Sequence, residues 1–308
     1  ARGVEVVELD MSAPFSAARA RNAGFERLSE IDPGVCFVQF LDGDCEVAGG
    51  WLDRARAALE DRPRAAVVFG RRNERFPDRS IYNRLADLEW NAAAPDEASD
   101  GTTTTCGGDA MMRSEAFRAV GGYDPSVPAG EEPELCGRLR GAGWSVVRLD
   151  ADMTWHDSAM FRFRQWAKRQ VRTGYGGLDF ATRFGSGGAN PFRRQIRSAR
   201  SWGLGWLPAV IAGGLLAARL AGPVAGGTAA GLLALTLPAQ MVRIATRNRS
   251  RAGSPRAALA YGVLTVVGKW FQMFGQLLYI RDRLSGRHAR LIEYKFAGSR
   301  AKRATSLP

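Results

Sequence analysis

Residues 37–44 read FVQFLDGD, an apolar run that ends in two aspartates separated by one glycine. Alternate residues of a strand point the same way, so Asp42 and Asp44 can face one site. Two carboxylates at the end of an apolar strand favour a hard divalent cation, which takes oxygen ligands and most often serves a diphosphate. The alternative is an ordinary polar turn after a buried strand, with Gly43 supplying the bend.

Short β-rich runs and helical stretches alternate around this segment, over residues 1–157. The pattern predicts strands at residues 4–9, 35–41, 65–69 and 145–149, and helices at residues 17–29, 50–60, 114–120 and 131–142. Such alternation predicts an α/β fold with a mostly parallel sheet flanked by helices. Ligands of these sheets bind beyond the carboxyl ends of the strands, where Asp42 and Asp44 fall.

The chain is strongly basic, with a net charge of +12 and a pI near 10.3. Such a chain can bind nucleic acid, an anionic membrane surface or phosphorylated substrates. The arginines do not interleave with exposed aromatic residues, and many flank apolar segments near the C-terminus. We therefore expect membrane lipids as partners and no nucleic acid.

Two long apolar segments rich in glycine and alanine cover residues 202–220 and 224–244, with a break at Gly222-Pro223. Each is near the roughly 20 residues that cross a bilayer core. Arginines cluster before and after the pair, whereas only Arg219 lies near the turn. The positive-inside rule predicts a transmembrane hairpin over residues 201–245 with both ends cytoplasmic. A buried hairpin in a globular domain is the alternative, and the basic flanks disfavour it.

Less decisive segments lie on both sides of this hairpin. The basic, aromatic connector at residues 158–200 fits either a helix on a membrane face or a surface helix packed on the α/β domain. The last part, residues 246–308, contains a third apolar stretch at 258–280 and a basic tail at 281–303. Lys269, Gln272 and Gln276 share one face of that stretch, which predicts an amphipathic or re-entrant helix on the cytoplasmic face, with a third span as the alternative.

Two helix-start segments offer polar side chains to the aspartate site. Arg21 and Asn22, on a predicted helix, can reach a phosphate or nucleotide, although an ordinary helix face would look the same. Glu131 and Glu132 open another helix, where acids are favoured by the helix dipole alone. A carboxylate there can also face the metal site and act as a general base.

Two further segments follow predicted strands or turns. Gly108 permits a close approach of the backbone to a ligand, and Asp109 follows it; a pair of turns is the alternative. Trp155-His156-Asp157 lies just beyond the strand at 145–149. His156 can be a metal ligand or contact a phosphate, although a lone histidine is more often structural.

Six elements occur in one order: SAARARNAGF, FVQFLDGD, CGGDAMMR, VGGYDP, GEEPELCGRLR and MTWHD. Their order and spacing resemble glycosyltransferase family 2, which has the GT-A fold, over residues 4 to about 176. The resemblance implies that Asp42 and Asp44 handle a Mg²⁺ or Mn²⁺ ion and a nucleotide diphosphate, with Asp44 as the direct metal ligand. It also implies that His156 contacts the metal or the diphosphate.

The same resemblance assigns the remaining roles. Glu132 stands where the family usually has an aspartate as catalytic base, and the longer side chain alters the reach. The donor side comprises Arg21, Asn22, Asp42, Gly108 and Asp109, and the acceptor side comprises Glu131 and Trp155. Family members begin with a strand and loop that cradle the nucleotide base, whereas this chain begins at what resembles the second strand. We therefore expect a truncated sequence.

These observations predict an inverting, metal-dependent glycosyltransferase at the cytoplasmic membrane, with its catalytic domain (residues 1–157) in the cytoplasm. It would move a sugar from a nucleotide-diphosphate sugar to a hydroxyl group of a lipid-linked or glycan acceptor. One alternative is a nucleotidyltransferase of similar fold, which shares the metal aspartates. Another is a non-catalytic, membrane-bound subunit of glycan assembly.

Overall fold

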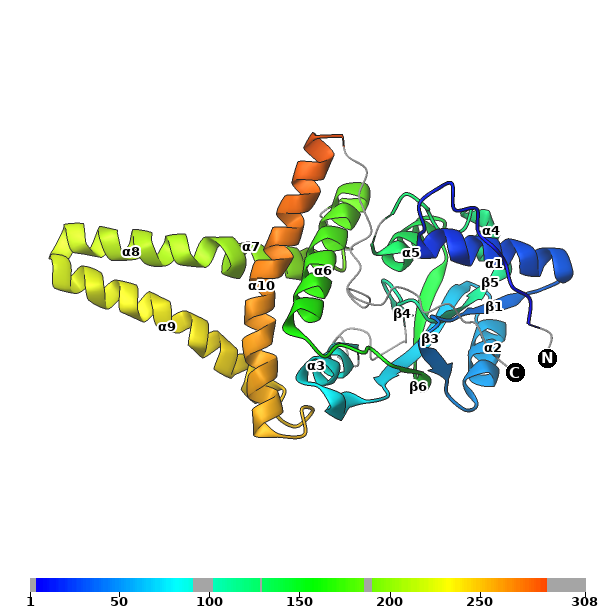
Figure 1. Cartoon of the computed structure of the whole chain (residues 1–308), viewed down its shortest axis with the longest axis horizontal. Helices are drawn as coiled ribbons and strands as arrows, with labels where there is room; N and C mark the ends of the chain where they lie inside the picture. The colour runs from blue at the N-terminus through cyan, green and yellow to red at the C-terminus, as the bar shows by residue number, and fades with distance from the viewer. Residues whose placement is uncertain (1–3, 91–101, 128, 186–189, 287–308) are drawn as a thin grey trace.

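The computed structural model describes residues 4–90, 102–127, 129–185 and 190–286 of the chain. Figure 1 shows an α/β domain on one side and a long hairpin of two helices that projects away on the other. Two further helices, α6 and α10, lie between these parts. The chain thus has an α/β domain followed by three long apolar C-terminal helices, in agreement with the predicted α/β fold class and its helical C-terminal region.

The sheet is mixed, with strand order β1-β5-β3-β6-β2 and the short β4 pairing with β6 off this path. The strands are β1 (Phe37–Phe40), β2 (Cys45–Val47), β3 (Ala65–Glu74), β4 (Thr102–Thr103), β5 (Ala110–Arg113) and β6 (Ser145–His156). Only β3 and β6 pair in parallel among the described strands; the other pairs are antiparallel.

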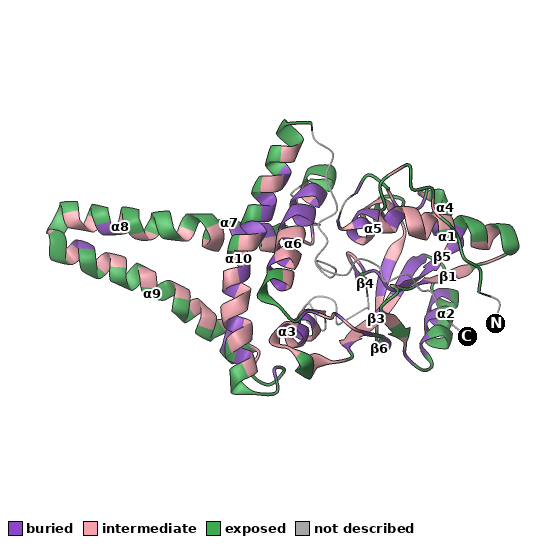
Figure 2. Cartoon of the chain, in the orientation of Figure 1, coloured by how far each residue is buried: buried purple, intermediate pink, exposed green. Residues whose placement is uncertain are grey.

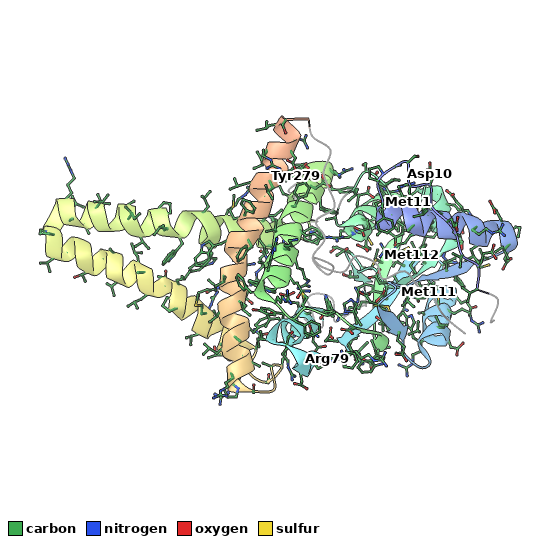
Figure 3. All side chains as sticks on the ribbon, in the orientation of Figure 1. Asp10, Met11, Arg79, Met111, Met112 and Tyr279 are labelled. Carbon is green, nitrogen blue, oxygen red and sulfur yellow. The ribbon has the colours of Figure 1, made fainter. Side chains whose placement is uncertain are left out.

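The predicted mostly parallel sheet is therefore wrong. The sequence pattern did not identify β5, which runs antiparallel between β1 and β3 and separates them. Met111 and Met112, labelled in Figure 3, belong to this strand. Because β5 runs antiparallel to both β1 and β3, those two strands run in the same direction. Strand β6 is parallel to β3 and runs the same way. Their carboxyl ends meet at one edge of the sheet, as the α/β pattern requires.

The predicted strand at residues 4–9 is also wrong, because residues 4–10 form no strand. Val4 and Val6 are 80% and 79% exposed, and Glu5 forms an ion pair with Arg27. In the described part of the chain, no strand pairs with this segment. Alternation of valine and glutamate is not sufficient for a strand without a neighbour to pair with.

The helices of the α/β domain lie close to the predicted positions, although α3 was not predicted. They are α1 (Ala17–Ile31), α2 (Trp51–Asp61), the 3₁₀ turn η1 (Pro77–Arg79), α3 (Ile81–Trp90), α4 (Ser114–Ala119) and α5 (Glu131–Gly141). The C-terminal part contains α6 (Phe163–Phe184), α7 (Arg193–Arg200), the π-helical turn η2 (Ser201–Gly205), α8 (Trp206–Ala221), α9 (Pro223–Arg247) and α10 (Pro255–Leu284).

Two apolar layers form on the two faces of the sheet. Successive strand residues point to opposite faces, so Val67 and Met112 join one layer and Val68 and Met111 the other. The first layer packs against α1, α4 and α5, and the second against α2, whose Trp51 is fully buried. This packing fixes the strand ends that carry the polar residues.

Helix α6 connects the α/β domain to the apolar C-terminal helices. Its Trp166 is buried in a cluster with Leu85 of α3 and Phe271 of α10. The predicted polar face of α10 lies in this interface, where Gln272 donates to the side-chain oxygen of Gln170 at 2.7 Å. The connector therefore contains a helix packed between α3 and α10.

Three helices are long and apolar enough to cross a membrane, which suggests membrane association. They cover Arg193–Ala221, Pro223–Arg247 and Pro255–Leu284. The most apolar windows of the first two are 6% buried and that of the third is 33% buried, because α10 also packs against α6. Figure 2 shows mostly exposed and intermediate residues along the hairpin. The basic tail predicted at 281–303 lies mostly outside the described residues.

The close packing of α6 on α10 depends on a glycine. A Cβ atom at Gly174 would lie 2.0 Å from the backbone oxygen of Gln272, so Gly174→Ala forces the two backbones apart. Overpacking of this kind costs about 1–3 kcal/mol of unfolding free energy. We expect unfolding of the detergent-solubilised protein to report this loss.

Gly227→Ala in α9 is the matched control, because nothing lies within 4 Å of the added Cβ atom. Alanine favours a helix over glycine, so this variant should be as stable as the wild type or slightly more stable. Equal stability of the two variants would contradict the close contact between α6 and α10.

Candidate active site

A cavity of about 770 Å³ lies between the α/β domain and α6. Most of the residues predicted for the site come together in its lining: Arg21, Asp42, Asp44, Gly108, Glu131, Glu132 and His156. Helix α6 supplies part of the opposite wall, which includes Arg169, Arg172, Thr173, Gly176 and Gly177.

A tight turn after β1 positions the two aspartates. The Cys45 N–H group donates to the backbone oxygen of Asp42 at 3.0 Å, and the Asp42 N–H group donates to Asp109 Oδ1 at 2.9 Å. The chain then enters β2, whose first residue pairs with His156 across the sheet. This pairing brings Asp44 Oδ1 to 3.4 Å from His156 Nε2.

Two arginines bind the carboxylate of Asp42. Arg21 Nη2 lies 2.6 Å from Oδ1, and Arg72 Nη2 lies 2.7 Å from Oδ2. Burial alone would raise the pKa of Asp42, but the charges and hydrogen bonds of Arg72 and Arg21 lower it. Asp42 is therefore ionised, and both of its oxygens are engaged by guanidinium groups.

Arg21 also joins Asp42 to the two glutamates at the start of α5. Its Nη1 atom lies 2.9 Å from Glu132 Oε1 and 3.3 Å from Glu131 Oε1. Burial alone would lower the pKa of Arg21, but the charges of Glu132, Tyr123, Asp42 and Glu131 raise it. One guanidinium group thus holds three carboxylates around the cavity.

Glu132 has the most perturbed acidity of these carboxylates. Burial, followed by the like charge of Glu131, raises its pKa to about 7, although Arg21 opposes the change. Gly130 precedes the helix at φ 88°, a backbone conformation that favours glycine and turns the chain into α5. A carboxyl group with a pKa near neutrality is suited to proton transfer.

Asp44 and His156 form the part of the site best suited to a cation. Their oxygen and nitrogen atoms are 3.4 Å apart, and both residues line the cavity. Glu74 lies behind His156, with Oε2 3.7 Å from Nδ1, and is held by the N–H groups of Phe76 and Ser158. A carboxylate behind a histidine is the usual support of a metal ligand.

The hydrogen bonds around Glu74 fix the charge behind that histidine. Burial alone would raise the pKa of Glu74, but the nearby His156 and hydrogen bonds from Ser158 and Phe76 lower it. The Trp90 ring packs edge-on against His156 at 4.6 Å between centroids. The imidazole is thus held in one orientation, and the geometry favours Asp44 over Asp42 as a cation ligand.

Three predicted site residues lie outside the cavity lining. Asp109 is fully buried and accepts hydrogen bonds from the Asp42 N–H group and from Thr154. The Asn22 amide donates to the Tyr123 carbonyl oxygen and accepts from the Tyr123 N–H group. Trp155 is 42% exposed. Asp109 and Asn22 thus support the site from behind.

Several residues in or behind the cavity lining were not identified from the sequence. Arg72 and Glu74 lie beyond the predicted end of their strand, because β3 continues to Glu74. Trp90 ends the unpredicted helix α3, and its ring lies 5.2 Å from the Arg72 guanidinium carbon. The polar run RRNE after the apolar part of β3 was the available signal for this extension.

Comparison with known proteins relates part of the chain to one family. Residues 9–121 match the family described as glycosyl transferase family 2. The chain is also similar to the pre-mycofactocin glycosyltransferase of two strains of Mycobacterium tuberculosis, with 28% identity over 171 residues. The alignment covers 54% of this chain and 35% of those relatives, so the chain matches about a third of their length.

Removal of Asp109 should weaken the whole cluster. Asp109→Ala takes away an acceptor of the Asp42 N–H group and the carboxylate that lies 3.2 Å from Arg72 Nε. Loss of one partner from a buried ion pair typically costs about 3–5 kcal/mol of unfolding free energy. We expect chemical denaturation to show a loss of this size.

Asp53→Ala is the control, because Asp53 is exposed in the first turn of α2. Its removal costs only the helix-dipole interaction, about 0.3–1 kcal/mol. Equal losses in the two variants would show that Asp109 does not hold the cluster together.

Proposed function

Since the chain contains a glycosyltransferase family 2 domain distantly homologous to pre-mycofactocin glycosyltransferase, we propose that it is an inverting, metal-dependent glycosyltransferase. It moves a sugar from a nucleotide-diphosphate sugar to an acceptor hydroxyl group at the cytoplasmic membrane face. The observation that carries the proposal is the convergence of a cation-type pair, Asp44 and His156, with an acid pair, Glu131 and Glu132, in one cavity.

Glu132 is the base in this proposal. Its pKa of about 7 lets it accept a proton from the acceptor hydroxyl group at neutral pH. The deprotonated oxygen attacks the anomeric carbon from the face opposite the leaving diphosphate, which inverts the configuration. Glu131 lies on the acceptor side, where its carboxylate is 3.9 Å from Arg172 of α6.

Asp44 and His156 would hold a Mg²⁺ or Mn²⁺ ion, and their oxygen and nitrogen donors fit such a cation. A bound ion would neutralise the charge that develops on the departing diphosphate. Asp42 would not contact the ion in this arrangement. Its carboxylate instead orients Arg21 and Arg72 at the edge of the cavity.

Gly108 lets a donor come close to the backbone on the donor side of the cavity. A Cβ atom at Gly108 would lie 2.7 Å from Asp42 Oδ2 and 2.8 Å from Arg21 Nη2, so a larger residue does not fit there. Arg21 supplies a positive charge at this position, which suits a diphosphate. Asn22 and Asp109 support the donor side by holding Tyr123 and Asp42 in place.

The part of the cavity lined by α6 is consistent with an acceptor that arrives from the membrane. Helix α6 supplies Arg169, Arg172 and Thr173 to the cavity, and the same helix packs on the candidate membrane helix α10. An acceptor carried on a lipid, or a glycan close to the membrane, would reach the acid pair from this side. The arginines flanking the hairpin support a cytoplasmic location for the site.

Glu132→Gln tests the proposed base. The variant keeps the shape of the side chain but cannot accept the proton, so we expect transfer to fall by about 10²–10⁴-fold. Nucleotide-sugar binding, followed by calorimetry, should remain close to that of the wild type. Undiminished transfer by the variant would remove Glu132 from this role.

The reaction products distinguish this function from a nucleotidyltransferase. A screen of nucleotide sugars on membranes that contain the protein should release a nucleoside diphosphate. Release of pyrophosphate would instead identify a nucleotidyltransferase. Absence of both products, together with no cation-dependent binding of any donor, would favour a non-catalytic subunit.

The pH dependence of transfer should follow Glu132. Because the ionised form is the active base and its pKa is about 7, kcat/KM should rise between about pH 6 and pH 8. Glu131→Gln removes the like charge that raises this pKa, so the rising limb should move to lower pH. Glu134→Gln is the control, since Glu134 pairs with Arg138 outside the cavity. An unmoved limb in Glu131→Gln would contradict the coupling.

A further inference from the structure

Helix α10 carries an exposed apolar stripe that the packing of the chain does not cover. The stripe consists of Leu259, Val263, Trp270, Phe274 and Leu277, whose spacings place them on one face of an α-helix. Leu259 and Phe274 are 51% and 53% exposed, and Trp270 and Leu277 are 40% and 47% exposed. An exposed apolar surface of this length needs a partner.

The other sides of α10 are covered by α6 and by the base of the hairpin. A Cβ atom at Gly262 would lie 2.2 Å from the backbone oxygen of Met241, near the end of α9. A Cβ atom at Gly203, in the turn before α8, would lie 2.6 Å from the backbone oxygen of Lys269. Both contacts are at the base of the hairpin. Figure 1 shows α10 crossing this base instead of running along the hairpin.

The packing of α6 on α10 opposes a membrane-spanning orientation of α10. The two helices are in contact from Trp166, which meets Phe271, to Tyr175, which meets Tyr279. A bilayer crossed by α10 would therefore also take in α6.

Helix α6 carries ionised groups along this length. Arg169 pairs with Glu89 of α3, and Arg183 pairs with Asp179 within the helix. Charged side chains at the bilayer centre are costly. Helix α6 also packs closely on the α/β domain at Gly176. The side of α10 that faces α6 must therefore point away from the lipid.

We propose that α10 lies in the plane of the membrane surface, across the base of the hairpin, with its apolar stripe in contact with lipid. This inference chooses between the interfacial helix and the third span that the sequence pattern leaves open. The hairpin alone then crosses the bilayer. An interfacial helix has this form, with one apolar face in the lipid and a polar face turned away from it. The polar face of α10 contains Lys269, Gln272 and Gln276.

The position of the stripe favours lipid over a second copy of the chain as its partner. The stripe lies beside the hairpin contacts, since Val263 follows Gly262 and Trp270 follows Lys269. The apolar surface of α10 is thus continuous with the exposed apolar surface of the hairpin base. Tryptophan is enriched at the boundary between membrane and water, where this geometry places Trp270.

Charge at the same level also favours a lipid surface. Arg200 Nε donates to Gln276 Oε1 at 3.1 Å, which fixes α7 beside α10. Three arginines of α7 are exposed and form no ion pair with another described residue: Arg193, Arg194 and Arg197. They stand at the start of the first candidate span. Cations in this position attract the phosphates of anionic lipids.

The inference places the cavity relative to the membrane. Helix α6 forms one wall of the cavity and packs directly on α10. Axes of packed helices are roughly 8–10 Å apart, so this wall lies about one helix layer from the lipid-bound helix. This placement does not depend on the reaction that the cavity carries out.

Thiol labelling tests on which side of the membrane the two ends of α10 lie. Cys36 and Cys45, the cysteines that are not buried, are replaced by serine in the full-length chain. One new cysteine is then introduced at the exposed residue Arg256 or Leu284, and a membrane-impermeant maleimide is added to sealed vesicles of known orientation. We expect Arg256→Cys and Leu284→Cys to react from the same side. Arg219→Cys, at the hairpin turn, is the control and should react only from the opposite side.

Spin labels in the same background measure depth through their accessibility to oxygen and to a water-soluble nickel chelate. Leu259 and Leu277 are 18 residues apart, which corresponds to about 27 Å along a helix. An interfacial helix gives equal, shallow depths for Leu259→Cys and Leu277→Cys, whereas a span gives clearly different depths. Leu207→Cys and Leu215→Cys on α8 are the matched control pair and should differ in depth.

Three outcomes would overturn the inference. Reaction of Arg256→Cys and Leu284→Cys from opposite sides would identify a third span. Reaction of Arg219→Cys from the same side as both would show that the hairpin does not cross the bilayer. Spin–spin broadening at Phe274→Cys, with neither oxygen nor nickel reaching the label, would identify a second copy of the chain on the stripe. None of these measurements uses sugar transfer, so the inference and the proposed function fail separately.

Discussion

The pairing of buried charges by Arg21 and Arg72 holds the cavity together. Four carboxylates, from Asp42, Asp109, Glu131 and Glu132, gather around these two guanidinium groups. A buried carboxylate without a partner would be strongly destabilising, so the arginines are a condition of the fold as well as of the site. Because the carboxylates outnumber the guanidinium groups, a negative field remains. Burial and then this field raise the pKa of Glu132, and the field also favours a cation near Asp44.

The C-terminal helices determine which face of the cavity is closed. Helix α6 approaches the α/β domain so closely that a Cβ atom at Gly176 would lie 2.7 Å from the Ala129 backbone oxygen. On its other side, α6 meets α10 backbone to backbone at Gly174 and Gly275. Small residues permit this approach on both sides of one helix. A wall of the cavity and a candidate membrane helix are therefore joined rigidly.

Local sequence identified the residues that follow a strand or open a helix. Asp42, Asp44 and Glu132 each stand where the apolar pattern ends, so their places could be predicted from strand and helix boundaries. Arg72 and Glu74 could not, because their strand continues into a polar segment and gains its order from pairing with β6. Trp90 reaches His156 only through the tertiary packing of α3.

The strand order could not be predicted from the sequence pattern either, because it also depends on pairing between distant segments. Strand β5 has four residues, and its direction is set by hydrogen bonds to β1 and β3, which are distant in the chain. Alternation predicts that a segment is extended and says nothing of its neighbours. The family match ends at residue 121. The roles proposed for Glu132 and His156 therefore rest on the structure and on the motifs GEEPELCGRLR and MTWHD.

The position of Arg21 links Asp42, on the proposed donor side, to Glu132, the proposed base. Its two nitrogens contact Asp42 at 2.6 Å and Glu132 at 2.9 Å, so one side chain serves both. The positive charge of Arg21 lowers the pKa of Glu132 against the effect of burial. An anion that draws Arg21 toward the donor side removes part of this stabilisation and raises that pKa. In the proposed function, a diphosphate bound at Arg21 would therefore make Glu132 a stronger base and would couple donor binding to proton acceptance through one guanidinium group.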